Sequence, residues 1–87
     1  MNTMLRMPKK GEPDAGTICG LSGLAPSTIY RDVKRGTFPK PVKIGAVSVW
    51  PEREVQAVLN ARIAGKSDEE ICAIVADLHR QRTNAAA

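Results

Sequence analysis

Apolar residues recur at helical spacing in three separate stretches of the chain. Ile29 and Val33 lie four residues apart. Two longer series follow at steps of one to four residues: Val55, Val58, Leu59 and Ile63, and then Ile71, Ile74, Val75 and Leu78. Residues spaced in this way share one face of a helix. The pattern therefore predicts helices over residues 26–35, 51–64 and 68–82.

Capping residues mark the ends of these helices. Pro26 suits the first turn, where no backbone N–H is needed, and Gly36 is a typical C-terminal stop. Ala25 stands at the N-cap, where a serine hydroxyl would accept an unpaired N–H, so this helix is expected to begin without a side-chain cap. Ser67 and Glu70 form a capping box ahead of the last helix.

One further short helix is predicted over residues 14–22. Asp14 or Thr17 can cap it, and its apolar positions are Ile18, Cys19 and Leu21. Its two glycines each weaken a helix by about 1 kcal/mol relative to alanine. Tertiary packing must therefore hold this helix in place.

Between the second and third predicted helices, apolar residues no longer recur at helical spacing but occupy every second position. The runs 42–44 and 47–49 alternate around the pair Gly45-Ala46. A glycine at the first position of a two-residue loop is typical of a type II′ turn between antiparallel strands. One face of the predicted hairpin carries Val42, Ile44, Val47 and Val49, and the other carries Lys43 and Ser48.

The order of these elements predicts a mainly α fold with a small β-hairpin. A short helix, a turn, a basic helix, a Phe38-Pro39 corner and a hairpin form the layout of a winged helix-turn-helix, to which an extra C-terminal helix is added. In such a fold the second helix can enter the DNA major groove. We expect one core made of Ile18, Leu24, Ile29, Val33, Phe38, Trp50, Val55, Leu59 and Ile63.

The 87 residues suffice for one small domain with additional segments at its ends. We expect a flexible basic arm over residues 1–16, the winged helix-turn-helix over 17–64, the C-terminal helix over 65–82 and a frayed tail over 83–87. The apolar stripe of the C-terminal helix either packs back on the domain or pairs with a second copy. Between these, the expectation is a weak or DNA-dependent homodimer through residues 67–82.

Charge is distributed unevenly along the chain. The first fifty residues hold eight basic and three acidic side chains, whereas the remainder holds five basic and six acidic ones, in keeping with the net charge of +4. A basic half suggests a polyanionic partner on one side of the molecule. Solvated surface lysines and arginines explain the same balance, so charge alone does not decide between the two.

The sequence offers little basis for catalysis or for a cofactor. It shows no nucleophile–base pair, no metal-ligand cluster and no phosphate-binding loop, so we expect neither an enzyme nor a metal or cofactor site. Cys19 and Cys72 have no metal-type spacing, and His79 is expected on the surface near a helix end. Two isolated cysteines and no secretory signal indicate a reduced, cytoplasmic protein. No stretch reaches the roughly 20 apolar residues of a membrane span.

Several short motifs together resemble those of a known family. They are GLAPSTIY at 23–30, KRG at 34–36, FPKPVKI at 38–44, and Trp50 followed by Glu54-Val55. In this order and spacing they are similar to the AlpA family, small prophage and genomic-island regulators related to phage excisionases and, more distantly, to MerR-type DNA-binding domains. The resemblance covers about residues 17–64, and residues 5–8 resemble the leading strand of the family.

The chain departs from the family pattern at a few positions. Ala25 replaces a usual serine, Val58 replaces a common tryptophan, and Ala46-Val47 stands where a basic wing-tip residue is usual. The wing is also one residue shorter, which weakens the case for its contact with DNA. Residues 9–16 form an apparent insertion before the first helix.

The resemblance implies a set of DNA-facing residues on the second helix: Ser27, Thr28, Tyr30, Arg31 and Lys34. Thr28 and Tyr30 serve equally well as partly buried packing residues. Arg31 has the shape for a guanine edge or a phosphate, while Lys34 and Arg35 suit phosphates. Lys40 and Lys43 are the candidates for phosphate contacts from the wing.

Three functions follow from these observations. The first is a sequence-specific regulator of a prophage or mobile element that binds double-stranded DNA, such as an activator of an integrase gene. The second is an excisionase that bends DNA and recruits integrase, for which the C-terminal helix is the obvious surface. The third is a protein-interaction module on a helix-turn-helix scaffold. Integrase and RNA polymerase are the expected protein partners of the first two.

Overall fold

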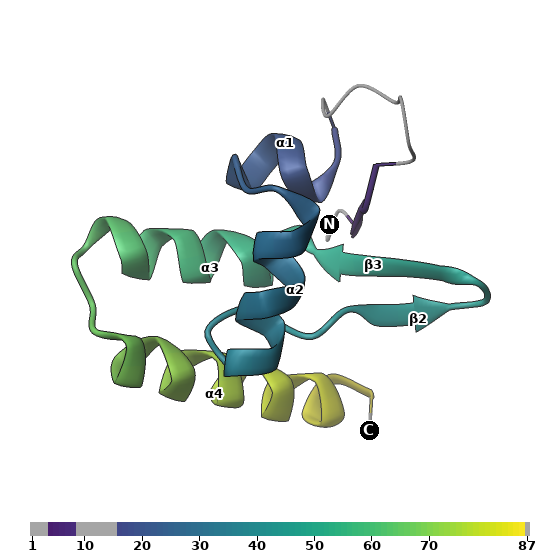
Figure 1. Cartoon of the computed structure of the whole chain (residues 1–87). Coiled ribbons are helices and arrows are strands. Elements are labelled where there is room, and N and C mark those ends of the chain that lie inside the picture. The colour runs from purple at the N-terminus through teal and green to yellow at the C-terminus, as the bar shows by residue number, and fades with distance from the viewer. Residues whose placement is uncertain (1–3, 9–15, 87) are drawn as a thin grey trace.

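The computed structural model describes residues 4–8 and 16–86, and within them four helices and a three-stranded antiparallel sheet (Figure 1). In chain order the elements are β1 (Met4–Arg6), α1 (Ile18–Ser22), α2 (Pro26–Arg35), β2 (Val42–Ile44), β3 (Val47–Pro51), α3 (Glu52–Ile63) and α4 (Asp68–Ala86). Most of the basic loop expected before α1, together with Asp14, falls in residues 9–15 and lies outside the described residues, as does Ala87.

The hairpin has the predicted register. Val42 pairs with Val49, Lys43 with Ser48 and Ile44 with Val47. Gly45 has a φ of 63°, whereas Ala46 does not take a positive φ. This combination matches the predicted type II′ turn, in which only the first loop residue is left-handed.

A third strand joins this hairpin. The predicted fold contained the hairpin alone and did not include this strand. β1 pairs antiparallel with β3, so that the strand order is β1-β3-β2. Leu5 lies opposite Trp50 and is buried. The segment resembling the leading strand of the family thus forms an edge strand, because burial of Leu5 beside Trp50 stabilises it.

The first two helices are joined by a short turn over residues 23–25. Thr17 is the N-cap of α1, where its hydroxyl accepts the N–H of Gly20 at 3.3 Å. α2 begins at Pro26 after an N-cap, Ala25, that makes no side-chain hydrogen bond, and Gly36 ends it at a φ of 83°. Both limits of α2 agree with the sequence prediction.

The core contains most of the predicted residues, with one clear error. Ile18, Ile29, Phe38, Trp50 and Val55 are buried as expected, and Leu24, Val33 and Leu59 are partly buried at the edge of the same cluster. Ile63, however, is 83% exposed. The buried face of α3 instead carries Glu54, Val55, Val58 and Ala61, because α4 packs against this face and Ile63 points away from it.

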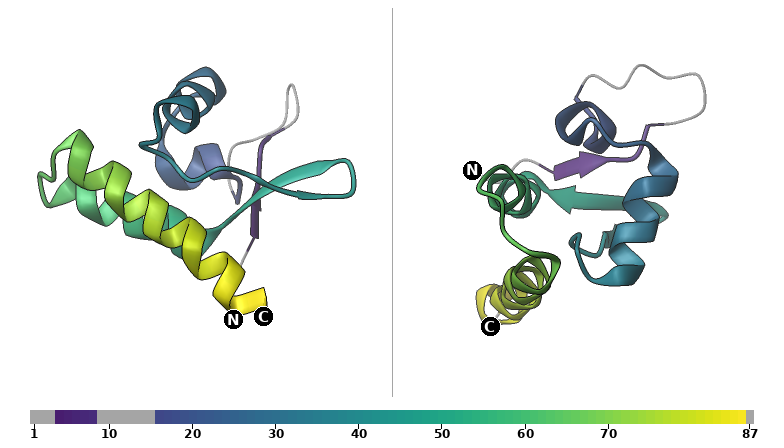
Figure 2. Two further views of the ribbon diagram at one scale, coloured as in Figure 1. Left: turned by 90° about the horizontal axis from the view of Figure 1, so that it is seen from below. Right: turned by 60° about the vertical axis from the view of Figure 1, so that its left-hand side comes forward.

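The apolar stripe of α4 is covered within the domain. Ile71, Val75 and Leu78 are buried, and Ile74 is partly buried against the core. Figures 1 and 2 show α3 and α4 side by side, joined at one end, with the β2–β3 hairpin pointing away from that joint. The stripe expected to pair with a second copy is therefore already occupied by this chain's own core.

The end of α4 also differs from expectation. The helix continues through Ala86, although the frayed tail was expected to begin at residue 83. The sequence after Arg82 contains neither glycine nor proline, and alanine is the residue that favours a helix most. Nothing in the sequence stops the helix at residue 82.

Candidate nucleic-acid interface

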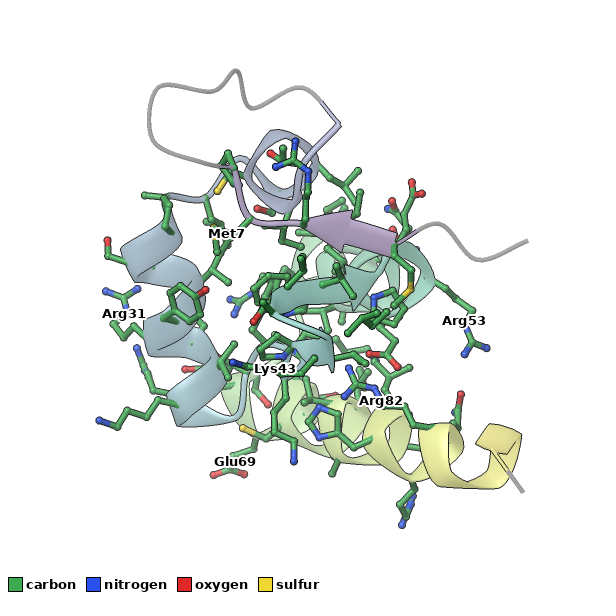
Figure 3. The ribbon with its side chains drawn as sticks, turned by 90° about the vertical axis from the view of Figure 1, so that its right-hand side faces the viewer. Met7, Arg31, Lys43, Arg53, Glu69 and Arg82 are labelled. Carbon is green, nitrogen blue, oxygen red and sulfur yellow. The ribbon has the colours of Figure 1, made fainter. Side chains whose placement is uncertain are left out.

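One face of α2 is exposed along its whole length. Ser27, Tyr30, Arg31 and Lys34 are all exposed, and their spacing of three, four and seven residues from Ser27 places them on one side of the helix. The Arg31 side chain is 63% exposed, and Figure 3 shows it pointing outward from α2. Ile29 on the opposite side of the helix is fully buried.

Packing against the sheet fixes the orientation of α2. The Tyr30 ring lies 6.2 Å from the Trp50 ring at a tilt of 56°, while 47% of Tyr30 remains exposed. Trp50 and Ser48 lie two residues apart on β3 and so share one face of the sheet, and Lys43 is paired with Ser48. Lys43 is therefore on the same side of the sheet as α2.

Two acidic side chains approach the cations of α2. Asp32 is buried and lies 3.6 Å from both the Arg31 Nε and an Arg62 guanidinium nitrogen. Asp68, at the start of α4, lies 3.8 Å from Arg35. Because Arg31 and Arg35 stay more than half exposed, these contacts still leave both guanidinium groups open to a ligand.

Residues 37–41 form the corner that leads from α2 to β2, and neighbouring elements hold its backbone. The indole N–H of Trp50 donates to the Pro39 carbonyl at 2.8 Å. Arg62 in α3 donates to the Thr37 carbonyl at 3.4 Å. Phe38 is buried, with its ring 6.4 Å from that of Trp50.

α4 holds the same corner at Lys40. The unprotonated Nε2 of His79 accepts the Lys40 N–H at 3.1 Å, and Arg82 donates to the Lys40 carbonyl at 2.7 Å. Burial, together with the charges of Arg82 and Lys40, lowers the pKa of His79 below its ordinary value of 6.5, while Glu54 acts in the opposite direction. His79 thus has a specific structural contact, contrary to the surface role expected for it.

The guanidinium group of Arg82 is anchored by a buried carboxylate. Glu54 is 1% exposed, and its two oxygens accept hydrogen bonds from Arg82, including one from Nε at 2.9 Å. Such a fork-to-fork pair fixes the direction of the guanidinium plane. Figure 3 shows Arg82 between α4 and the sheet. Arg82 thereby joins α3, α4 and the corner.

The structure brings the expected DNA-facing residues together only in part. Ser27, Tyr30, Arg31 and Lys34 share the outer face of α2, while Thr28 is half-buried at its edge and Arg35 lies toward α4. Lys40 is exposed on the corner and Lys43 on the hairpin. We call these eight residues together the candidate interface.

Sequence reasoning missed the residues that support the corner of the candidate interface. Glu54 and Arg82 are 28 residues apart, and no local pattern pairs them. Glu54 was noted only as part of a motif, since a glutamate in the first turn of a helix usually faces solvent. A bidentate pair of this kind becomes visible only when α4 is placed against α3.

The part of the chain that the structure describes contains no cluster of three or more histidine, cysteine, aspartate or glutamate residues suited to a metal ion. None of its described helices combines the length and the apolar character needed to cross a membrane.

Comparison with known proteins identifies relatives of this chain. Residues 17–63, more than half of its length, match the family described as prophage CP4-57 regulatory protein (AlpA). An uncharacterized protein, ORF88 of Enterobacteria phage P4, is 42% identical over 55 residues, which cover 62% of this chain. The matched region spans 59% of the length of that phage protein. No solved structure matches the chain. The match to the family spans α1 through α3, and the chain belongs to the AlpA family of prophage regulatory proteins.

Proposed function

We propose that this protein is a sequence-specific double-stranded DNA-binding regulator of a prophage or other mobile element. In this proposal α1 and α2 form the helix-turn-helix, the β2–β3 hairpin is the wing, and the unit acts in the cytoplasm. Membership of a family of prophage regulators supports this role. The regulated gene suggested by the family resemblance is an integrase gene.

The observation that carries the proposal is the open outer face of α2. It presents a hydroxyl, a phenol, a guanidinium and an ammonium group from one regular helix, at Ser27, Tyr30, Arg31 and Lys34. A helix of about this width fits the major groove, where such donors meet base edges and phosphates. The opposite face of α2 is anchored in the core, so the helix can be presented as a rigid unit.

The hairpin adds a second, weaker element to the proposed interface. Lys43 lies on the α2 side of the sheet and Lys40 on the corner before it, and both can reach phosphates next to the groove that α2 occupies. Since Ile44, Ala46 and Val47 at the tip are uncharged and exposed, we assign the phosphate contacts to the base of the hairpin rather than to its tip.

The excisionase alternative makes different demands on the molecule. It needs several adjacent sites on DNA, bending of the duplex and a contact with integrase. The apolar stripe of α4 that could have served such a contact is buried in the domain, and we therefore favour the regulator. Footprinting over the attachment region, which would show one protected site or several, separates the two.

The proposal is tested by fluorescence anisotropy with two labelled duplexes. One duplex comes from the region upstream of the protein's own gene, and the other has the same composition in random order. We expect tighter binding to the first, with a steep dependence of affinity on salt. Equal and weak binding to both duplexes at all salt concentrations would favour the protein-interaction module instead.

A further inference from the structure

The corner over residues 37–41 links the two parts of the proposed interface. It connects the helix assigned to the groove with the hairpin, and it carries Lys40 and leads directly to Lys43. Any change in its direction moves both lysines relative to α2. Its backbone geometry therefore decides whether the two ammonium groups can reach phosphates while α2 lies in the groove.

Two of the hydrogen bonds on this corner come from α4. The N–H of Lys40 is held by His79 and its carbonyl by Arg82, so that both sides of one residue are fixed by side chains three residues apart on one helix. Glu54 in turn fixes the guanidinium of Arg82 from α3. Residues 64–86 fall outside the match to the family, so that match does not account for this contact.

We propose that His79 and Arg82 are positioning residues for DNA binding, which hold Lys40 so that Lys40 and Lys43 reach the phosphate backbone together with α2. This inference rests on the proposed function. The contact has the chemistry of a restraint rather than of a ligand site, because the backbone of Lys40 is bound and its side chain is left exposed. Holding the corner in advance lowers the ordering cost that binding would otherwise carry.

The inference predicts a change in salt dependence from a substitution that removes no positive charge. His79 is neutral above its lowered pKa, so that His79→Phe at pH 7.5 keeps the charge of the protein constant. We expect this variant to lower the slope of log Kd against log salt by about one to two, as loss of one or both lysine contacts with phosphate does. His79→Gln can still accept the Lys40 N–H through its amide oxygen and should retain most of the slope.

The matched controls separate the restraint from a direct role of α4 charges. Arg82→Lys keeps the positive charge but cannot bind Glu54 and the Lys40 carbonyl in the same way, and it should lose slope as His79→Phe does. Arg80→Gln removes an exposed charge of α4 whose partner is Asp77, and its slope should match the wild type. Lys43→Ala sets the scale for one lost contact, and adding His79→Phe to it should remove the remaining contact of Lys40 as well.

The restraint on Lys40 can also be measured in the free wild-type protein, without any variant. Lowering the pH protonates Nε2 of His79, which then can no longer accept the Lys40 N–H. The groups facing this ring are Arg82 on α4, Lys40 on the corner and Glu54 on α3. After correction for intrinsic rates, hydrogen exchange should show that the Lys40 amide loses protection as the pH falls from 7.5 through the lowered pKa of His79, whereas the amides of α2 keep theirs.

The outcomes distinguish this inference from the proposed function. If Lys43→Ala lowers the slope but His79→Phe and Arg82→Lys do not, the corner holds itself and the inference is wrong, while the proposed function stands. If none of these variants alters the slope, the corner does not contact DNA and the inference is equally wrong. An unprotected Lys40 amide at pH 7.5 would overturn it without any DNA experiment.

Discussion

Arg31 on α2 and Arg82 on α4 lie in opposite environments. Arg31 on α2 is 63% exposed, and the buried Asp32 at 3.6 Å from it has Arg62 as a second partner, whereas Arg82 on α4 is 25% exposed and is bonded to the buried Glu54. An exposed guanidinium exchanges water for a ligand at little cost, while one that compensates a buried carboxylate cannot leave it without a large penalty. This difference supports the proposal that α2 binds DNA, and it gives the end of α4 a structural role.

The largest expected effect comes from removing Arg82, which pairs with the buried Glu54 and holds the corner. Arg82→Ala leaves the Glu54 carboxylate buried without a partner and should cost about 3–5 kcal/mol of folding free energy. Urea denaturation followed by Trp50 fluorescence measures it. Arg80→Ala is the matched control, since the exposed pair with Asp77 should contribute at most about 1 kcal/mol. An unchanged urea midpoint in Arg82→Ala would contradict the assignment of α4 to support.

Two isoleucines test whether α4 packs on the domain. Ile71 on α4 is buried, and Ile71→Ala should destabilise the protein by about 2–5 kcal/mol. Ile63→Ala is the control: this side chain is 83% exposed, and the change should stay within about 0.5 kcal/mol. Equal effects of the two substitutions on the thermal midpoint would mean that α4 does not cover the core.

A substitution at the start of α2, the helix proposed to bind DNA, should stabilise the protein. Ala25 is its N-cap and makes no side-chain hydrogen bond. Ala25→Ser supplies an acceptor for an N–H of the first turn and should stabilise the protein by about 1 kcal/mol. The same urea titration measures it, and a lower midpoint in the variant would show that the backbone at residue 25 cannot seat a capping hydroxyl.

The smallest expected effect is a dependence of stability on pH. The folded protein lowers the pKa of His79 below 6.5, so the unfolded chain binds a proton more readily. Stability should therefore decrease as the pH falls from about 6.5 through the lower folded pKa, and His79→Gln should remove this decrease. At lower pH a second decrease should persist in both proteins, because hydrogen bonds lower the pKa values of Glu70 and Asp77. An unaltered profile in His79→Gln would mean that folding does not lower the pKa of His79.

Local signals in the sequence were sufficient to predict much of this fold. Pro26 and Gly36 gave the limits of α2, because each fits only one end of a helix. Gly45 gave the register of the hairpin, because a left-handed first residue selects the turn. These are interactions between near neighbours in the chain.

The errors arose where distant segments decide the outcome. Ile63 follows Val55 and Leu59 at steps of four and was predicted to be buried, yet the position of α4 sets the buried face of α3 at Glu54, Val58 and Ala61. The same packing of α4 buries its apolar stripe in the core, although that stripe was expected to pair with a second copy of the chain. For the candidate interface, the basic residues of α2 could be proposed from sequence, while the support of the corner by Arg82 could not, because it depends on a contact across 42 residues to Lys40.

The central claim is that the outer face of α2 reads DNA, with Arg31 as its specificity residue and Lys34 as a phosphate contact. The most direct measurement is the ratio of Kd values for the upstream and random duplexes in wild type, Arg31→Ala and Lys34→Ala. We expect Arg31→Ala to lose about 1–3 kcal/mol on the upstream duplex and little on the random one, while Lys34→Ala weakens both alike and lowers the salt slope by about one. Equal weakening of both duplexes by Arg31→Ala would contradict the claim.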